Sequence, residues 1–227
     1  MEESVSIFKR SSNPVPRYYI YISQTKVEML VPQIPRSYLR SLEAEIKVNV
    51  APVAVGVKKP ASAPSPELTA KTNVLSDYLE KKKGWVGTVA SPGRYVKGVA
   101  SLQYGVLRSY FLKEGRLAFF GSGDVDGVKV GLIGSAASLV GTPDTDADAD
   151  HSLNSYQLMF LGNVAEEDSL EEIAAMVRNH DVAARVLDVV FEVGVLPHQH
   201  RLEFLAKPLL HDEGLLVATP IYVAFAD

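Results

Sequence analysis

The stretch between Gly93 and Gly141 most constrains the fold, because its pattern predicts successive β-strands joined by short turns. β-branched and aromatic side chains are frequent there, as they are near the C-terminus. Strand-like segments occupy residues 94–107, 116–120, 128–133, 201–206 and 215–225. Asp126-Gly127 lies between two of them and predicts a hairpin, since type I′ turns need positive φ at both central residues.

Helical patterns lie in separate blocks. A short strand at 18–22 precedes a short helix over 26–30, and a second helix is expected from Pro35. A longer helix is expected over 66–83, with Ser65 as its N-cap, and another region begins with the capping box at Ser169. Shorter β-like segments lie at 48–57 and 156–161. We therefore predict an α+β fold with segregated helices and a mostly antiparallel sheet, open or barrel-like.

We expect one globular domain over residues 18–227, preceded by a flexible arm at residues 1–17 that ends in Pro14-Val15-Pro16. The net charge of −4 argues against nucleic acid as a partner, because phosphate binding needs clustered cations. The absence of cysteine excludes disulfides and thiolate metal sites. With no apolar signal segment and no run of roughly 20 apolar residues, we expect a cytoplasmic protein without membrane association.

Ser23-Gln24-Thr25-Lys26 has the Ser-x-x-Lys spacing of the penicillin-binding serine enzymes. The pattern also occurs at Ser6 and Lys9, and about one match is expected by chance in a chain with this composition. The companion motifs of those enzymes are missing. An N-cap role for Ser23 explains the same residue, so we predict a cap and keep a nucleophile as the less favoured alternative.

Three other motifs have simple structural explanations. The alternating aspartates of residues 144–150 lack the Gly and Glu of an EF-hand loop, so a solvated acidic loop is favoured. Gly121-Ser122-Gly123 lies between two strands and lacks the third glycine of a dinucleotide loop. His198 and His200 lie two residues apart and can share a metal on a strand, but surface histidines are favoured, and no metal or cofactor is predicted.

The favoured ligand site lies on the strand at 201–206, where Arg201 and Glu203 share one face. A carboxyl group in an apolar pocket has a raised pKa and can act as a general acid. We predict Glu203 and Arg201 as catalytic residues. The residues predicted to line a substrate pocket are Tyr21, Tyr95, Tyr104 and Tyr222. The alternative is a solvated strand face with a surface ion pair.

Several blocks in order, among them "YYIYISQTKVEMLVPQIP", "VGTVASPGRYVKGVASLQYG", "RLEFLAKPL" and "ATPIYVAFA", resemble a family of uncharacterised actinobacterial proteins common in Streptomyces. The resemblance covers most of residues 18–226 and implies a bacterial, cytoplasmic, single-domain protein with no assigned activity. Some proteins of this kind lie in polyketide pathways, where small cofactor-free cyclases act. Gly121-Ser122-Gly123 departs from the tighter glycine pair expected there.

These observations lead to two functional hypotheses. The first is a cofactor-independent cyclase or isomerase, such as a spiroketal-forming enzyme, acting on a bulky apolar metabolite. Glu203 would transfer the proton, and Arg201 or a tyrosine would hold an oxygen, while the pocket fixes a reactive conformer. The alternative is a non-enzymatic module that binds a small molecule or a protein in regulation or defence. A homodimer is compatible with either.

Overall fold

The computed structural model describes residues 17–39, 64–108, 116–125, 127–141, 199–212 and 214–226. Its strands are β1 (Tyr19–Ile22), β2 (Val86–Gly87), β3 (Tyr95–Arg108), β4 (Arg116–Val125), β5 (Val128–Ser135), β6 (Gln199–Asp212) and β7 (Leu215–Phe225). Its helices include α1 (Gln24–Leu30) and α3 (Pro66–Lys81), with 3-10 turns η1 (Val31–Gln33) and η2 (Ala136–Ser138). Residues 36–39 are also helical, and Leu39 N donates to Pro35 O, so a helix starts at Pro35 as predicted. The segments predicted at 48–57, at 156–161 and after Ser169 lie outside the described residues.

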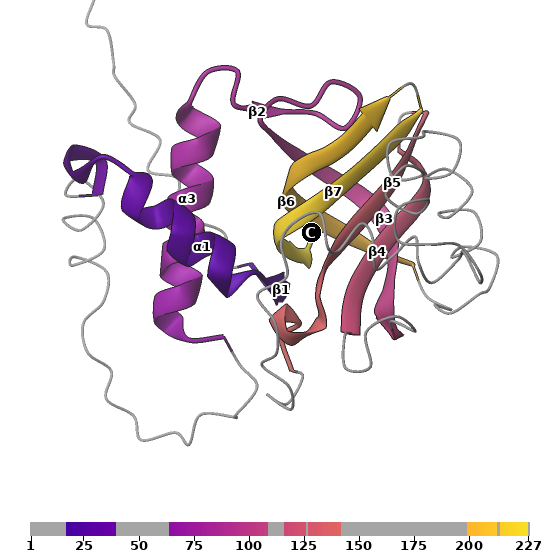
Figure 1. Cartoon of the computed structure of the whole chain (residues 1–227), viewed down its shortest axis with the longest axis horizontal. Coiled ribbons are helices and arrows are strands. Elements are labelled where there is room, and N and C mark those ends of the chain that lie inside the picture. The colour runs from indigo at the N-terminus through magenta and orange to yellow at the C-terminus, as the bar shows by residue number, and fades with distance from the viewer. Residues whose placement is uncertain are drawn as a thin grey trace, which may run out of the picture.

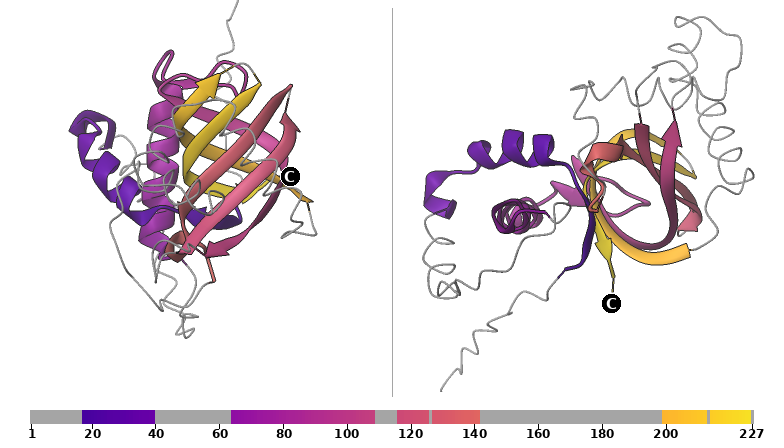
Figure 2. Two further views of the ribbon diagram at one scale, coloured as in Figure 1. Left: turned by 45° about the vertical axis from the view of Figure 1, so that its right-hand side comes forward. Right: turned by 90° about the horizontal axis from the view of Figure 1, so that it is seen from below.

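Five of the strands close into a barrel. β3 pairs with β4, β4 with β5, β5 with β7, β7 with β6, and β6 again with β3. Only the pair of β5 and β7 within this ring is parallel. The right view of Figure 2 shows the strands curved around a common centre, with α1 and α3 on one side. The predicted α+β fold with a mostly antiparallel sheet is confirmed, and the sheet is closed.

β7 organises the sheet because it pairs along both of its edges. One edge pairs with β6 from Leu215 to Phe225. The other pairs with β5 over Leu215–Ala218 and with β1 over Tyr222–Ala224. The three residues between these two partners, Thr219–Ile221, include a proline, which has no N–H to donate. Because neither β5 nor β1 pairs with this segment, its carbonyl groups are open to other donors on that edge.

Two β-bulges decide which side of the sheet several tyrosines face. Ile221 is the extra residue of β7 where its register with β6 shifts, and Ile20 is the extra residue of β1 where its register with β7 shifts. A bulge reverses the faces of the residues beyond it. Tyr222 therefore packs outside the barrel, while Tyr19 and Tyr21 lie on opposite sides.

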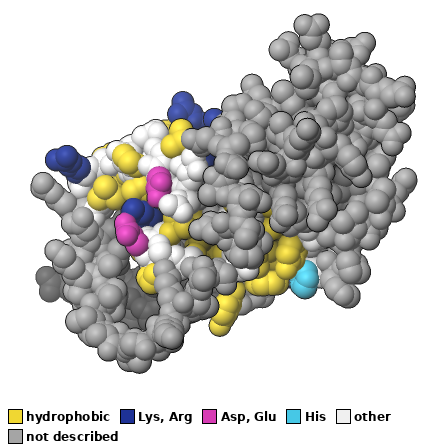
Figure 3. Space-filling view, turned by 60° about the horizontal axis from the view of Figure 1, so that its bottom comes forward, with side chains coloured by type: hydrophobic (Ala, Val, Ile, Leu, Met, Phe, Trp, Pro, Cys, Tyr) yellow, Lys and Arg dark blue, Asp and Glu magenta, His cyan; other side chains and the backbone are white. Residues whose placement is uncertain are grey.

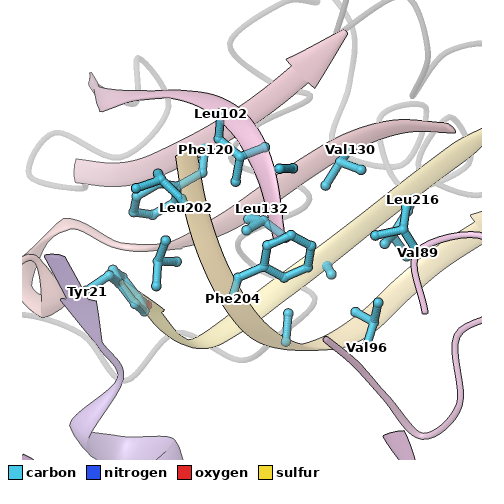
Figure 4. Packing of buried hydrophobic residues seen from close by; sticks show 14 of the residues in the cluster. Tyr21, Val89, Val96, Leu102, Phe120, Val130, Leu132, Leu202, Phe204 and Leu216 are labelled. Atoms are coloured by element: carbon cyan, nitrogen blue, oxygen red, sulfur yellow. The ribbon is translucent and has the colours of Figure 1, made fainter. Parts of the chain in front are cut away.

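Alternate side chains of the five strands fill the barrel. The buried residues of its interior are Val96, Ala100, Leu102, Ala118, Phe120, Val128, Val130, Leu132, Leu202, Phe204, Ala206, Leu216, Ala218 and Val223. Tyr21 and Val89 complete the cluster at opposite ends (Figure 4). Val89 belongs to the turn that follows β2. Side chains thus occupy the space inside the strands, as in other small barrels.

Two glycines make room for rings in this interior. A Cβ atom at Gly134 would overlap the Tyr21 hydroxyl group, and one at Gly98 would lie 2.7 Å from Phe204 Cζ. Tyr21 and Phe204 are both buried, so neither ring has free space to move into. Gly134 and Gly98 are therefore required by packing rather than by backbone conformation.

The helices cover the outer face of β1, β6 and β7 (Figure 1). α3 begins as predicted, because Ser65 Oγ accepts a hydrogen bond from Leu68 N at 3.0 Å and Pro66 occupies the first turn. The buried residues between helices and sheet are Tyr19, Ile22, Val27, Ile34, Leu75, Leu79, Leu205, Ile221, Tyr222 and Ala224. This outer cluster and the barrel interior share β1 and β7.

Candidate functional site

A continuous row of aromatic rings runs from the barrel interior to one of its ends. Tyr21 and Tyr104 both contact Phe120, with ring centroids 5.8 and 5.6 Å apart respectively. Tyr104 also lies 5.6 Å from the ring of His200, which lies 5.6 Å from that of Phe225. The row starts at buried residues and ends at Phe225, which is 41% exposed.

Strand alternation and pairing place these rings. Tyr104 and His200 continue the inward-facing positions of β3 and β6 beyond Leu102 and Leu202, where β6 begins and its pairing with β3 stops. Phe225 pairs with Leu202 across β6 and β7. The Phe225 backbone N–H donates to Tyr18 O at 2.9 Å, which brings Tyr18 beside it.

We call Tyr18, Tyr104, His200 and Phe225 the aromatic rim. Tyr18 is 74% exposed, while Tyr104 and His200 are half-buried. Figure 3 shows hydrophobic side chains gathered on one part of the described surface, with a histidine at their margin. Exposed aromatic groups backed by a rigid row of rings are typical of a surface that binds another molecule.

The predicted acid Glu203 lies elsewhere, in a polar cluster on the outer face. Tyr222 Oη donates to Glu203 Oε1 at 2.6 Å, and Arg17 Nε lies 3.1 Å from the same oxygen. Lys97 Nζ is 3.9 Å from Oε1 and 3.0 Å from Glu80 of α3. Burial, with the hydrogen bond to Glu203, raises the pKa of Tyr222, so this hydroxyl stays a donor at neutral pH.

The same cluster ties the residue before β1 to α3. Arg17 Nη1 and Tyr19 Oη both donate to Asn73 Oδ1, at 3.2 and 2.6 Å. The Arg17 guanidinium also lies 5.5 Å from the centre of the Tyr222 ring. Glu203 is thus a carboxylate held by neighbours from three parts of the chain. This arrangement suits an anchor between the barrel and α3.

The structure divides the six predicted site residues into separate places. Glu203 and Tyr222 are brought together by a hydrogen bond. Arg201 is exposed on the same face of β6, and Tyr95 packs against the outer cluster. Tyr21 and Tyr104 belong to the barrel side of the sheet. The four tyrosines therefore do not line one common pocket, and the catalytic roles of Glu203 and Arg201 stay predictions.

The Ser-x-x-Lys motif forms a contact that differs from the predicted cap. Ser23 occupies the N-cap position of α1, but its side chain makes no capping hydrogen bond. Its Oγ instead accepts from Lys26 Nζ at 3.3 Å, and Nζ also donates to Pro220 O at 3.1 Å. Burial lowers the pKa of Lys26 to about 8. The short helix is confirmed, but the predicted capping bond is wrong.

Among the described residues no group of three potential metal ligands is close enough to hold an ion. His200 contacts the rings of Tyr104 and Phe225 instead. His198 and the acidic residues 144–150 lie outside the described residues. In the same part of the chain, no helix is long and apolar enough to cross a membrane.

Sequence reasoning missed that His200 joins Tyr104 to Phe225, and that Tyr18 lies beside Phe225. Alternation along β3 and β6 predicts that Tyr104 and His200 face inward, because each lies two residues from an apolar residue that faces the barrel interior. The pairing register that brings Phe225 to them connects residues far apart in the sequence, and no local pattern encodes it.

Comparison with known proteins gives a family without a function. Residues 17–227 match the family of unknown function DUF7019, and the chain belongs to this family. Neither a curated protein nor a solved structure matches the chain. The match covers every described residue, so the barrel and its helices lie within the region that the family model matches.

Proposed function

We propose that this member of the DUF7019 family is a protein-interaction module whose contact surface is the aromatic rim. The observation that carries the proposal is the row of rings that ends in exposed Phe225, to which the backbone of exposed Tyr18 is hydrogen-bonded. Aromatic residues dominate the energetically important positions of protein interfaces. The rim is therefore suited to accept apolar side chains of a partner.

The packing behind the rim supports this role. Tyr104 stacks on Phe120 with an interplanar angle of 26°, and Phe120 is fully buried. A ring held from behind loses little rotamer freedom when a partner binds, which lowers the cost of association. The filled barrel interior favours a ligand that binds at this end over one enclosed by the strands.

The test compares proteins retained by tagged variants expressed in the native host. The variant Tyr18→Ser/Phe225→Ser removes two exposed rings at the rim. The matched control is Met29→Ser, because Met29 on α1 is 64% exposed and lies outside the rim. Quantitative mass spectrometry should find a partner retained by the wild type and the control but depleted about 10-fold or more with the rim variant.

Equal retention by all three proteins, or no specific partner, would contradict the proposal. Unfolding profiles of the variants exclude loss of the fold as the cause. A small apolar molecule retained in native mass spectrometry by the wild type, and lost with the rim variant, would instead make the rim a small-molecule site.

A cofactor-independent cyclase or isomerase is the second candidate. The contact of 2.6 Å between Tyr222 Oη and Glu203 favours it, since it pairs the proposed acid with a tyrosine. Its substrate would have to reach Glu203 from the outer face of β6. Glu203→Gln should then abolish turnover of the natural substrate while the protein stays folded, and unchanged turnover would remove this role.

A further inference from the structure

The bulge of β7 holds Ser23 and Lys26 in a fixed arrangement. Ser23 N donates to Ile221 O at 2.8 Å, which continues the pairing of β1 with β7 by one residue. Lys26 Nζ donates to the preceding carbonyl, Pro220 O. Both contacts use backbone groups in the gap where β7 is paired with neither β5 nor β1. The two side chains are thus positioned by the sheet as well as by α1.

Lys26 is placed as a base for Ser23. Its Nζ lies 3.3 Å from Ser23 Oγ, and none of the salt bridges among the described residues involves Lys26. A partly buried ammonium group without a carboxylate gives up its proton more easily. With a pKa of about 8, about a tenth of the side chain is neutral at pH 7, against far below 1% for an ordinary lysine.

The same segment of β7 carries a polar side chain without a partner among the described residues. Thr219 directly precedes Pro220, and its Oγ1 is fully buried without a hydrogen-bond partner among the described atoms. Buried hydroxyl groups are seldom left unpaired, because each costs stability. Thr219 therefore leaves an unpaired hydroxyl group one residue before the carbonyl that Lys26 contacts.

We propose that Ser23 and Lys26 form a serine–lysine pair in which Ser23 Oγ accepts an acyl group from a small activated ester or thioester. Neutral Lys26 takes the proton of Ser23 Oγ as the oxygen attacks the carbonyl carbon. The bond from that carbon to the leaving oxygen or sulfur then breaks, and the Lys26 ammonium group protonates the leaving group. The product is an acyl-serine ester, with Lys26 neutral again.

The low exposure of Ser23 limits the size of the acyl donor. Ser23 is 5% exposed, while its neighbours Gln24 and Thr25 are exposed at the surface. Because so little of Ser23 is exposed, we expect only small acyl donors to reach Oγ. This activity is independent of the aromatic rim, which lies at the other end of β1.

The probe is p-nitrophenyl acetate, followed by peptide mass spectrometry of the full chain. We expect a time-dependent acetyl group on Ser23, absent in Ser23→Ala. Its rate should rise with pH through an inflection near 8, the pKa of Lys26. In Lys26→Met the inflection should vanish and the rate should fall about 100-fold, the usual contribution of a positioned base.

The chain contains its own control, because Ser6 and Lys9 have the same spacing. Ser6→Ala should leave the labelling of Ser23 unchanged. Acetylation of Lys26 in place of Ser23, equal labelling of Ser6 and Ser23, or no labelling of Ser23 in the wild type would each overturn the proposal. The pH profile of the wild type tests it even if a variant fails to fold.

Discussion

Lys26 gives the most direct quantitative test of the structure, through the pH dependence of stability. Its pKa is 10.5 in an ordinary environment and about 8 in the folded protein. A depressed lysine pKa means that the unfolded chain binds more protons between these two values. Raising the pH through this window therefore stabilises the fold, and lowering it towards 8 destabilises it.

The magnitude follows from proton linkage. A difference of 2.5 pKa units between folded and unfolded chains corresponds to about 3 kcal/mol of lost stability at pH 8 and below. Between pH 8 and about pH 9.5, roughly 1.5 kcal/mol of it should be recovered. This window stays below the titration of Tyr222, whose pKa is raised by its burial.

Lys26→Met removes the titrating group and keeps most of the side-chain volume. Urea unfolding followed by the fluorescence of Trp85, the single tryptophan, gives the free energy of unfolding at each pH. We expect the wild type to gain about 1.5 kcal/mol of stability relative to the variant from pH 8 to about pH 9.5. The loss of the contact with Pro220 O is the same at both pH values and cancels in this comparison.

The matched control is Lys71→Met, because the Lys71 side chain is 39% exposed and its hydrogen bond with Glu67 raises its pKa rather than lowering it. Its effect should not change across the same window. If Lys26→Met and the wild type show parallel pH profiles, Lys26 is not desolvated, and the argument for a neutral base beside Ser23 fails with it.

Two further predictions concern packing and the polar cluster. Gly134→Ala should cost about 1–3 kcal/mol by unfolding, since its Cβ overlaps the Tyr21 hydroxyl, and Tyr21→Phe should restore part of that loss in the double variant. Additive effects would show that the two positions do not touch. Glu203→Gln should cost about 1–2 kcal/mol, because it replaces the charged acceptor of Tyr222 with a neutral one. A variant as stable as the wild type would argue against the anchoring role of Glu203.

The sequence predicted the elements well where local signals agree. β7 spans residues 215–225 as predicted, and the cap at Ser65 and the positive φ at Gly127 both match. β6 is longer than the predicted 201–206, and it continues past Pro208. A register shift next to Pro208 lets the proline remain in the strand. Strands were therefore predicted to end too early at proline and glycine. β4 is a second example, because it continues through Gly121-Ser122-Gly123.

The site was harder to predict because two single-residue bulges control it. Leu216 and Ala218 face the barrel interior, so regular alternation would also turn Tyr222 inward. The extra residue Ile221 reverses the alternation, so that Tyr222 faces outward and contacts Glu203. Likewise, Tyr19 and Tyr21 would share a face without the bulge at Ile20. Bulges depend on pairing between distant strands, so composition and periodicity alone do not reveal them.

Both proposed sites depend on the docking of β1 against β7. Tyr18 O accepts from Phe225 N before β1 begins, and Ser23 N donates to Ile221 O after it ends. Because the bulge at Ile20 sets the register of β1 on β7, a change there would disturb the rim and the Ser23–Lys26 pair together. Side-chain changes at Phe225 leave these backbone bonds in place, so they separate the two sites. An effect of the rim variant on Ser23 acetylation would therefore mean that β1 itself moves when the rim is altered.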